Sequence, residues 1–163
     1  MILVTIGTNE QPFDRLVLAA AALETDEQVI VQYGSSRAVE PREGWVEFLP
    51  YDELSALARE ACVVVCHAGV GSILMARQAG KSPVVMARRH ALGEAVDDHQ
   101  VVLARRLASN GLVTLVDDQA ELAAAVQQIG DGARSVGRPG VQGLPGARAL
   151  AADLREQLSR LAA

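Results

Sequence analysis

Short apolar runs alternate along this chain with longer segments in which apolar residues recur every three or four positions. The runs are too short for helices and rich in β-branched residues, which is typical of strands buried on both faces. The expected strands cover residues 2–6, 28–32, 45–48, 63–65, 83–87 and 112–116, and helical periods fill the connections between them. This alternation predicts an α/β fold, a Rossmann-like parallel sheet of about six strands with helices on both faces and right-handed crossovers.

The most informative stretch is 61–83, ACVVVCHAGVGSILMARQAGKSP, because a buried strand in it runs directly into a glycine-rich turn. Two glycines, Gly69 and Gly71, indicate that the backbone passes close to another group. Ser72 is expected to cap a helix that ends near Ala79, with Gly80 as its stop. A helix that begins at the carboxyl edge of a sheet offers unpaired N–H groups and a positive dipole end, so this turn predicts an anion site, above all for phosphate.

Two common phosphate motifs do not fit this stretch. The dinucleotide fingerprint requires a third glycine where Leu74 stands, and it normally follows the first strand of the fold. The P-loop requires a glycine at Met75, and a helix precedes the tripeptide that begins at Gly80 where a strand should. An ordinary strand-to-helix connection, in which the glycines serve packing alone, remains open as the alternative.

Composition narrows the function classes. A chain of 163 residues, half of them hydrophobic, is long enough for one domain with a real core. No apolar run approaches the roughly 20 residues that span a bilayer, so we expect a cytoplasmic protein. The net charge of −5 and the five aromatic residues argue against a nucleic-acid surface. Cys62 and Cys66 would lie about 13 Å apart on one strand, which excludes a disulfide between them, and their spacing predicts no metal site. We expect no cofactor.

The loops of the sheet and the C-terminal part of the chain have different expected roles. In the parallel sheet, the loops at 7–9, 34–36, 67–72 and 88–94 leave carboxyl ends of strands and can share one pocket. Segment 130–146 has six glycines and two prolines in 17 residues, too many for a packed element, and is expected to be a linker. An apolar stripe then predicts an amphipathic helix over 147–163 that packs on this domain or on another protein. Residues 1–129 form one expected folded domain.

Five motifs occur in an order that carries a family resemblance: VTIGTNEQPFDRL, FLPYDEL, HAGVGSIL, AGKSPVVMARR and LGEAVDDHQ. They resemble the C-terminal, donor-binding half of glycosyltransferase family 28, in particular its stand-alone members, the small subunits of two-subunit UDP-sugar transferases. The resemblance covers roughly residues 1–128. It implies one half of a GT-B enzyme that binds a UDP-sugar, while a membrane-attached subunit holds a lipid-linked acceptor in polysaccharide or glycolipid synthesis. Attachment to the cytoplasmic membrane would then pass through that partner.

The resemblance also implies a set of donor-binding residues, with the catalytic base supplied by the partner. The donor diphosphate would contact Gly7, Thr8, Gly69, Gly71 and Ser72. The donor sugar would face Asp98, His99 and Gln100. The remaining candidates in the set are Asn9, His67, Met75, Arg88 and Glu94.

Several of these residues have a second interpretation. His67 is also suited to holding the turn in place, and Arg88 and Arg89 are either diphosphate counter-charges or parts of a solvated loop. Asp97 and Gln100 have the spacing of a capping box, which gives no reason for His99 between them.

Two departures from the family pattern support a different function. Relatives commonly have Glu, which the resemblance assigns to the ribose hydroxyls, where this chain has Met75, and often His where it has Asn9. An asparagine cannot act as a general base. The alternative hypothesis is therefore a non-catalytic nucleotide-sugar-binding or regulatory module. A third, an NADP-binding domain with Arg88 and Arg89 on the ribose phosphate, meets the same objection as the dinucleotide fingerprint.

Overall fold

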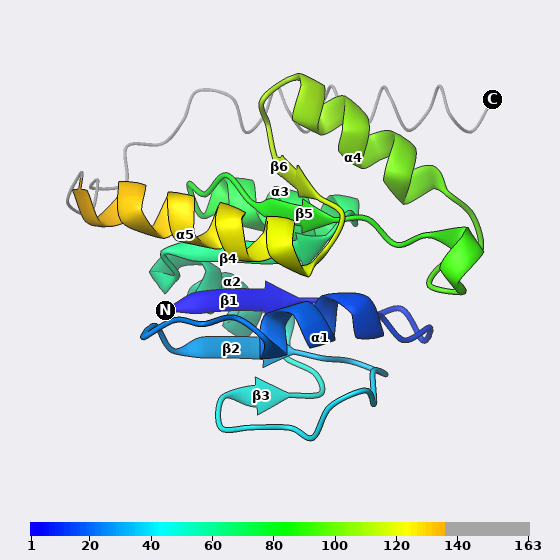
Figure 1. Ribbon diagram of the computed structural model, residues 1–163, viewed down its shortest axis with the longest axis horizontal. Coiled ribbons are helices and arrows are strands. Elements are labelled where there is room, and N and C mark those ends of the chain that lie inside the picture. The colour runs from blue at the N-terminus through cyan, green and yellow to red at the C-terminus, as the bar shows by residue number, and fades with distance from the viewer. Residues whose placement is uncertain (136–163) are drawn as a thin grey trace.

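A computed structural model describes residues 1–135 of the chain as one parallel sheet covered by helices on both faces (Figure 1). The strands are β1 (Ile2–Thr5), β2 (Val29–Gln32), β3 (Trp45–Val46), β4 (Val63–His67), β5 (Val84–Met86) and β6 (Thr114–Val116). Their order is β3-β2-β1-β4-β5-β6, and every neighbouring pair is parallel. The expected six-stranded parallel sheet is confirmed.

A helix follows every strand except β2, which leads directly to β3. The helices are α1 (Asp14–Ala21), α2 (Tyr51–Glu60), α3 (Val70–Gln78), the short 3₁₀ helix η1 (His90–Leu92), α4 (His99–Ser109) and α5 (Gln119–Ser135). Helices α1 and α5 lie together over one face of the sheet, in front of it in Figure 1. Helices α2, α3 and α4 cover the other face, where their apolar residues pack on the sheet.

Side-chain alternation along the central strands explains this two-sided core. Ile2 and Val4 of β1 face the α1 and α5 layer, while Leu3 between them packs with Val64 of β4 and with α2. Because successive residues of a strand point to opposite faces, a run in which every residue is apolar can bury both faces of the sheet. The continuous apolar runs of β1 and β4 therefore place these strands at the centre.

The chain reverses direction across the sheet between β1 and β4. The crossover after β1 leads through α1 to β2 on one side, whereas the crossover after β4 leads through α3 to β5 on the other. The loops that leave these two strands thus diverge to opposite faces. In open α/β sheets such a switch point leaves a crevice at the carboxyl edge, and ligands bind there.

Three helix ends, two of α3 and one of α4, test the expected capping signals. The Gly80 stop of α3 is confirmed: Lys81 N–H donates to Ala76 O and Gly80 N–H to Arg77 O, with a positive φ at Gly80. The expected Ser72 cap is wrong, because α3 already begins at Val70 with Gly69 as its N-cap. The Asp97 and Gln100 capping box is also wrong, since Gln100 Oε1 accepts instead from Arg88 N–H at 3.4 Å.

Helix α5 continues to Ser135, so residues 130–135 of the expected linker are helical. Leu122, Ala125 and Val126 of this helix are buried against the sheet. The rest of the expected linker and the expected C-terminal helix at 147–163 lie outside the described residues.

Candidate functional site

An open cavity of about 310 Å³ lies at the switch point, at the carboxyl ends of β1, β2 and β4. It is bounded by these strand ends, by the first turn of α3, and by the segment that joins β3 to α2. The lining residues are Thr5, Gly7, Thr8, Gln32, Phe48, Leu49, Tyr51, Leu54, His67, Gly71, Ser72 and Met75. Six of them, Gly7, Thr8, His67, Gly71, Ser72 and Met75, belong to the set expected from the sequence.

The imidazole of His67 is enclosed between two glycines. A β-carbon built at Gly7 would lie 2.4 Å from the ring, and one built at Gly69 would lie 2.1 Å from Nε2. Both distances are far below van der Waals contact, so any side chain at either position would have to displace the ring. Gly7 and Gly69 are therefore glycines because His67 packs there, which is the packing alternative that the sequence left open.

No packed side chain explains why position 71 is a glycine. A β-carbon built there would meet nothing within 4 Å, and it would project from the first turn of α3, on the lining of the cavity. No side chain caps the N-terminus of α3. The first N–H groups of a helix have no intrahelical partner, and they carry the positive end of its dipole. This corner of the cavity can therefore receive an anion on backbone donors.

His67 is neutral at physiological pH. Burial, the largest cause, and the positive charge of Arg88 lower the pKa of the imidazole to about 4, although a hydrogen bond with the backbone of Thr5 acts in the opposite direction. Its Nδ1 lies 3.5 Å from Ser72 Oγ. A neutral ring that lines the cavity can donate or accept a hydrogen bond there, but it does not supply a counter-charge.

One wall of the cavity is apolar. Phe48 and Tyr51 are 60% and 62% exposed at its rim, and Leu54 lies deeper, in the first turns of α2. Such a wall suits a flat, weakly polar ring better than a phosphate.

Met75 lies at the base of this cavity but is not free to turn toward a ligand. It is 1% exposed and packs with Leu3, Leu54 and Val64 in the core beneath α2 and α3. Met75, a candidate for donor binding, therefore lines the cavity but belongs to the core. A glutamate at this position would place a charge among apolar side chains, which costs several kcal/mol unless a partner is present.

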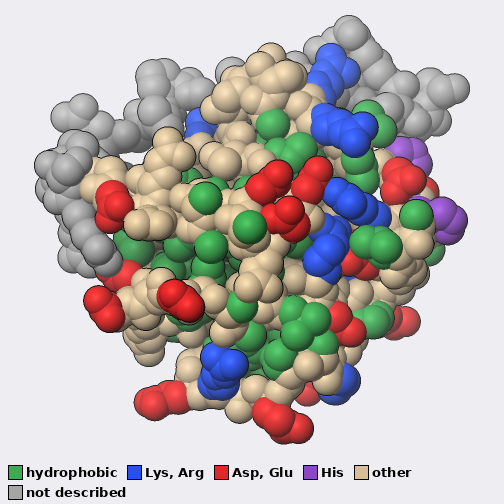
Figure 2. All heavy atoms as spheres, in the orientation of Figure 1, with side chains coloured by type: hydrophobic (Ala, Val, Ile, Leu, Met, Phe, Trp, Pro, Cys, Tyr) green, Lys and Arg blue, Asp and Glu red, His purple; other side chains and the backbone are tan. Residues whose placement is uncertain are grey.

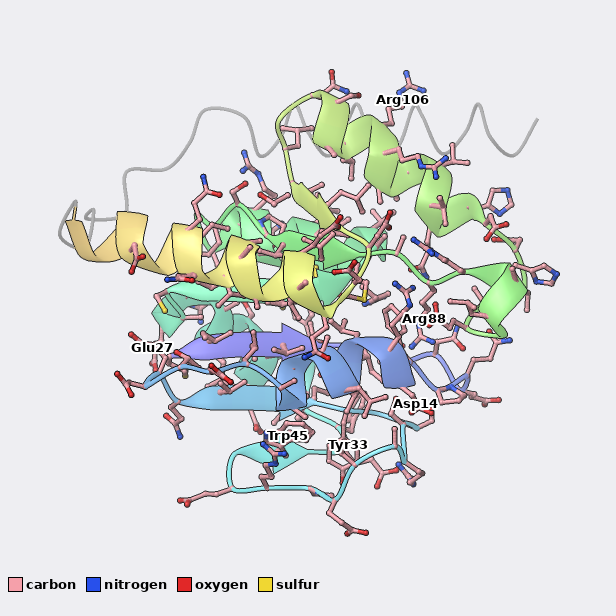
Figure 3. All side chains as sticks on the ribbon, viewed as in Figure 1. Asp14, Glu27, Tyr33, Trp45, Arg88 and Arg106 are labelled. Atoms are coloured by element: carbon pink, nitrogen blue, oxygen red, sulfur yellow. The ribbon has the colours of Figure 1, made fainter. Side chains whose placement is uncertain are left out.

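Arg88 is committed to the protein interior. Its side chain is fully buried, and Figure 3 shows it beside the loop between β1 and α1. Its guanidinium donates to Ile6 O, Gln11 O, Pro12 O and Glu94 O at 2.8–3.2 Å. These four bonds hold the first loop against the loop after β5. Arg88 is thus neither a solvated residue nor a side chain with donors directed at the cavity.

Glu94 is paired in the same way. Its carboxylate accepts two hydrogen bonds from Arg15, at 2.7 and 3.0 Å, and a third from Arg89 N–H at 2.9 Å. The exposed fraction of Glu94 is 6%. The pair ties α1 to the β5 loop, and neither residue lines the cavity.

The remaining candidates lie at the same edge of the sheet but do not line the cavity. Asp98 accepts from His90 N–H at 2.9 Å, and His99 is exposed with its Nδ1 2.6 Å from Asp97. Figure 2 shows histidine side chains on the surface at this end of the molecule. Asn9 is exposed, and its side chain accepts from Gln11 N–H at 2.8 Å, which closes a local turn. Asp98, His99 and Gln100 open α4 beside the β5 loop, on the side of the sheet away from β2 and β3.

Several residues of the far wall and of the floor are not among the candidates expected from the sequence. Phe48, Leu49 and Tyr51 belong to FLPYDEL, a motif that contributed only to the family resemblance. Thr5 and Gln32 are polar residues at the ends of apolar strands. A polar residue at that position could have indicated that it lines the pocket at the carboxyl edge of the sheet.

The described residues offer neither a metal centre nor a membrane-spanning helix. No group of three or more His, Cys, Asp or Glu residues within 1–135 is arranged to hold a metal ion. Over the same range, none of the helices combines the length and the apolar character needed to cross a bilayer.

Comparison with known proteins identifies the family. The model of the glycosyltransferase family 28 C-terminal domain matches residues 1–135. The chain belongs to glycosyltransferase family 28. It is 32% identical over 122 residues to the UDP-N-acetylglucosamine transferase subunit ALG13 of Yarrowia lipolytica (strain CLIB 122 / E 150), an alignment that covers 66% of this chain and 60% of the relative. The chain thus spans less than two thirds of that protein.

The fold of this family 28 domain also occurs in a solved glycosyltransferase. The crystal structure of CalG4, the calicheamicin glycosyltransferase, superposes on 79% of this chain and 33% of its own with a TM-score of 0.55, at 17% sequence identity. At that identity the likeness concerns the fold alone. It confirms the expected Rossmann-like fold.

Proposed function

We propose that this family 28 domain is the donor-binding subunit of a two-part glycosyltransferase. It would transfer a sugar from a UDP-sugar to a lipid-linked acceptor, in the synthesis of a polysaccharide or glycolipid. A membrane-attached partner would hold the acceptor, which would bring the chain to the cytoplasmic face of a membrane. The similarity to a protein named as a transferase subunit supports a division of the enzyme between two chains.

The observation that carries the proposal is the uncapped start of α3 at the switch point. There the empty space over Gly71 adjoins N–H groups with no intrahelical partner. A diphosphate fits this corner because backbone N–H groups and a helix dipole bind anions without a charged side chain. The aromatic rim at Phe48 and Tyr51, on another side of the same cavity, suits the uracil ring.

The chemistry expected of this chain is leaving-group stabilisation. As the bond from the sugar to the diphosphate breaks, negative charge grows on UDP, and the first N–H groups of α3 are positioned to stabilise it. A base must also remove the proton of the attacking hydroxyl. Among the described residues that line the cavity there is no carboxylate, the lowered pKa of His67, about 4, makes its imidazole a weak base, and the Asn9 amide cannot accept that proton. We therefore assign the base to the partner.

Titration calorimetry of the full chain with UDP tests this proposal. Wild type should bind UDP, and Gly71→Val should weaken binding at least tenfold because its side chain would occupy the phosphate corner. Gly130→Val is the matched control: Gly130 also lies in a helix, with nothing within 4 Å of an added β-carbon, and far along the chain from the cavity. Equal UDP affinity in wild type and Gly71→Val, or tighter binding of NADPH than of UDP, would contradict the proposal.

The second candidate function is a nucleotide-sugar-binding module without catalysis. Asn9 and Met75 favour it, because an exposed amide and a buried thioether stand where the family resemblance expects a histidine and a carboxylate. A transfer assay separates the two candidates. Activity that appears only when a membrane fraction from the source organism is added favours the split enzyme, whereas UDP binding with no transfer under either condition favours the binding module.

A further inference from the structure

One polar group in the cavity has no partner within the protein. Gln32, the last residue of β2, is 1% exposed and lines the cavity. Its Oε1 atom is buried and accepts no hydrogen bond. A buried acceptor without a donor costs free energy, because it has given up water and received nothing in return. Such an atom on the lining of a binding cavity points to a ligand that donates to it.

The orientation of the Gln32 amide is fixed by its neighbour. Nε2 donates to the carbonyl oxygen of Gly7 at 3.2 Å. Rotating the amide by half a turn would bring Oε1 against that carbonyl, where two acceptors would face each other with no proton between them. The Gly7 carbonyl thus uses Nε2 of the amide and leaves Oε1 available as an acceptor.

The surroundings of Gln32 offer the ligand no equivalent acceptor. Thr5 lies opposite Gln32 in the register of β1 and β2, on the same face of the sheet, and its hydroxyl already accepts from Gly7 N–H at 3.2 Å. Met75 contributes only a thioether, a weak acceptor. Among the described residues that line the cavity, Gln32 carries the one buried side-chain acceptor that lacks a donor.

We propose that Gln32 Oε1 accepts a hydrogen bond from the nucleoside part of the donor substrate and that Gln32 is a specificity-determining residue. This inference rests on the proposed function. The donor is a ribose hydroxyl or the N–H of the base, because phosphate oxygens are acceptors at neutral pH and would repel Oε1. The contact also orients the substrate, with its nucleoside over the end of β2 and its diphosphate at the start of α3.

The test is titration calorimetry of the full chain with UDP, 2′-deoxy-UDP, 3′-deoxy-UDP and N3-methyl-UDP. Wild type should bind one of the three analogues about tenfold more weakly than UDP, and that analogue identifies the donor. Gln32→Met keeps the length of the side chain but offers no amide oxygen. It should bind UDP about tenfold more weakly than wild type and should bind UDP and that analogue equally.

A control variant and two outcomes decide the inference. Gln28→Met makes the same substitution at an exposed position just before β2 and should leave all four affinities unchanged. Equal affinity of wild type for UDP and all three analogues would overturn the inference without any variant. The same loss with the analogue in wild type and in Gln32→Met would also overturn it, while leaving the proposed function intact. No UDP binding by wild type would instead overturn the proposed function, and this inference with it.

Discussion

The two sides of the carboxyl edge of the sheet differ in what their polar groups do. On the β5 side, Arg88 and Glu94 are charged and buried, and the hydrogen bonds that they form go to the protein itself, although Arg88 Nε is buried without a partner. On the β1 and β2 side, few groups are charged, yet the start of α3 is uncapped and Gln32 Oε1 has no donor. Charge in a loop is thus a poor guide to ligand binding here. An unsatisfied hydrogen-bonding group is the better guide when it also lines the cavity, as Gln32 does and Arg88 does not.

The largest expected effect on stability comes from removing the hydrogen bonds that the Arg88 guanidinium donates to backbone carbonyls. Arg88→Met would leave buried carbonyls of Ile6 and Glu94 unpaired, together with those of the loop before α1. At about 1–3 kcal/mol for each buried unpaired group, we expect the free energy of unfolding to fall by at least about 3 kcal/mol. Thermal melting should show a decrease of about 10 °C or more.

Arg89→Met is the control for this prediction. Arg89 pairs with Asp117 at 2.7 Å, but both side chains are more than a third exposed, and exposed pairs contribute only about 0–1 kcal/mol. Equal melting temperatures for Arg88→Met and wild type would show that the guanidinium is free to serve a ligand, which would break the comparison between the two sides.

Acid should destabilise the protein through His67, on the cavity side. The pKa of this imidazole is about 4 in the folded chain and about 6.5 when unfolded, so between these values the unfolded state binds the proton more readily. The stabilisation is complete above pH 6.5 and is lost as the pH falls toward 4. The loss should total about 2–3 kcal/mol.

Urea denaturation of wild type and His67→Gln at pH 7.5, 5.5 and 4.5 measures this effect. Carboxylates titrate in the same range in both proteins, so the difference between the two curves isolates the imidazole. The gap in unfolding free energy should change by about 2–3 kcal/mol from pH 7.5 to pH 4.5. A constant gap would mean that His67 is not held neutral between Gly7 and Gly69.

Most of the fold could be predicted from the sequence because its signals are local. The apolar runs that form β1 and β4, and the glycine stop at Gly80, act within a few residues of themselves. The cavity was located for a similar reason, since the turn that begins at His67 directly follows a buried strand. The caps expected at the starts of α3 and α4 were misjudged because Ser72 Oγ lies near His67 Nδ1 and Gln100 Oε1 accepts from Arg88 N–H, contacts that the local sequence does not reveal.

The roles of single side chains could not be predicted in this way, because they depend on contacts distant in sequence. Arg88 reaches carbonyls 76 to 82 positions away, and the Gln32 amide is oriented by a carbonyl 25 positions away. Met75 is core because Leu3 and Leu54 pack against it. Periodicity places such residues on an element, but only the assembled sheet decides whether their polar groups are satisfied.

The smallest effect on stability, and the sharpest distinction, concerns Gly71. If its missing side chain serves only a ligand, Gly71→Ala should stabilise the free protein, because alanine favours a helix by about 0.5–1 kcal/mol over glycine and nothing in the fold obstructs the new methyl group. The same methyl group would enter the phosphate corner and should weaken UDP binding about tenfold.

Gly130→Ala should give a similar gain in stability with unchanged UDP affinity. Urea denaturation and calorimetry on both variants measure the two quantities. A loss of stability in Gly71→Ala would assign Gly71 to packing, like Gly69, and a gain with unchanged UDP affinity would place the diphosphate elsewhere.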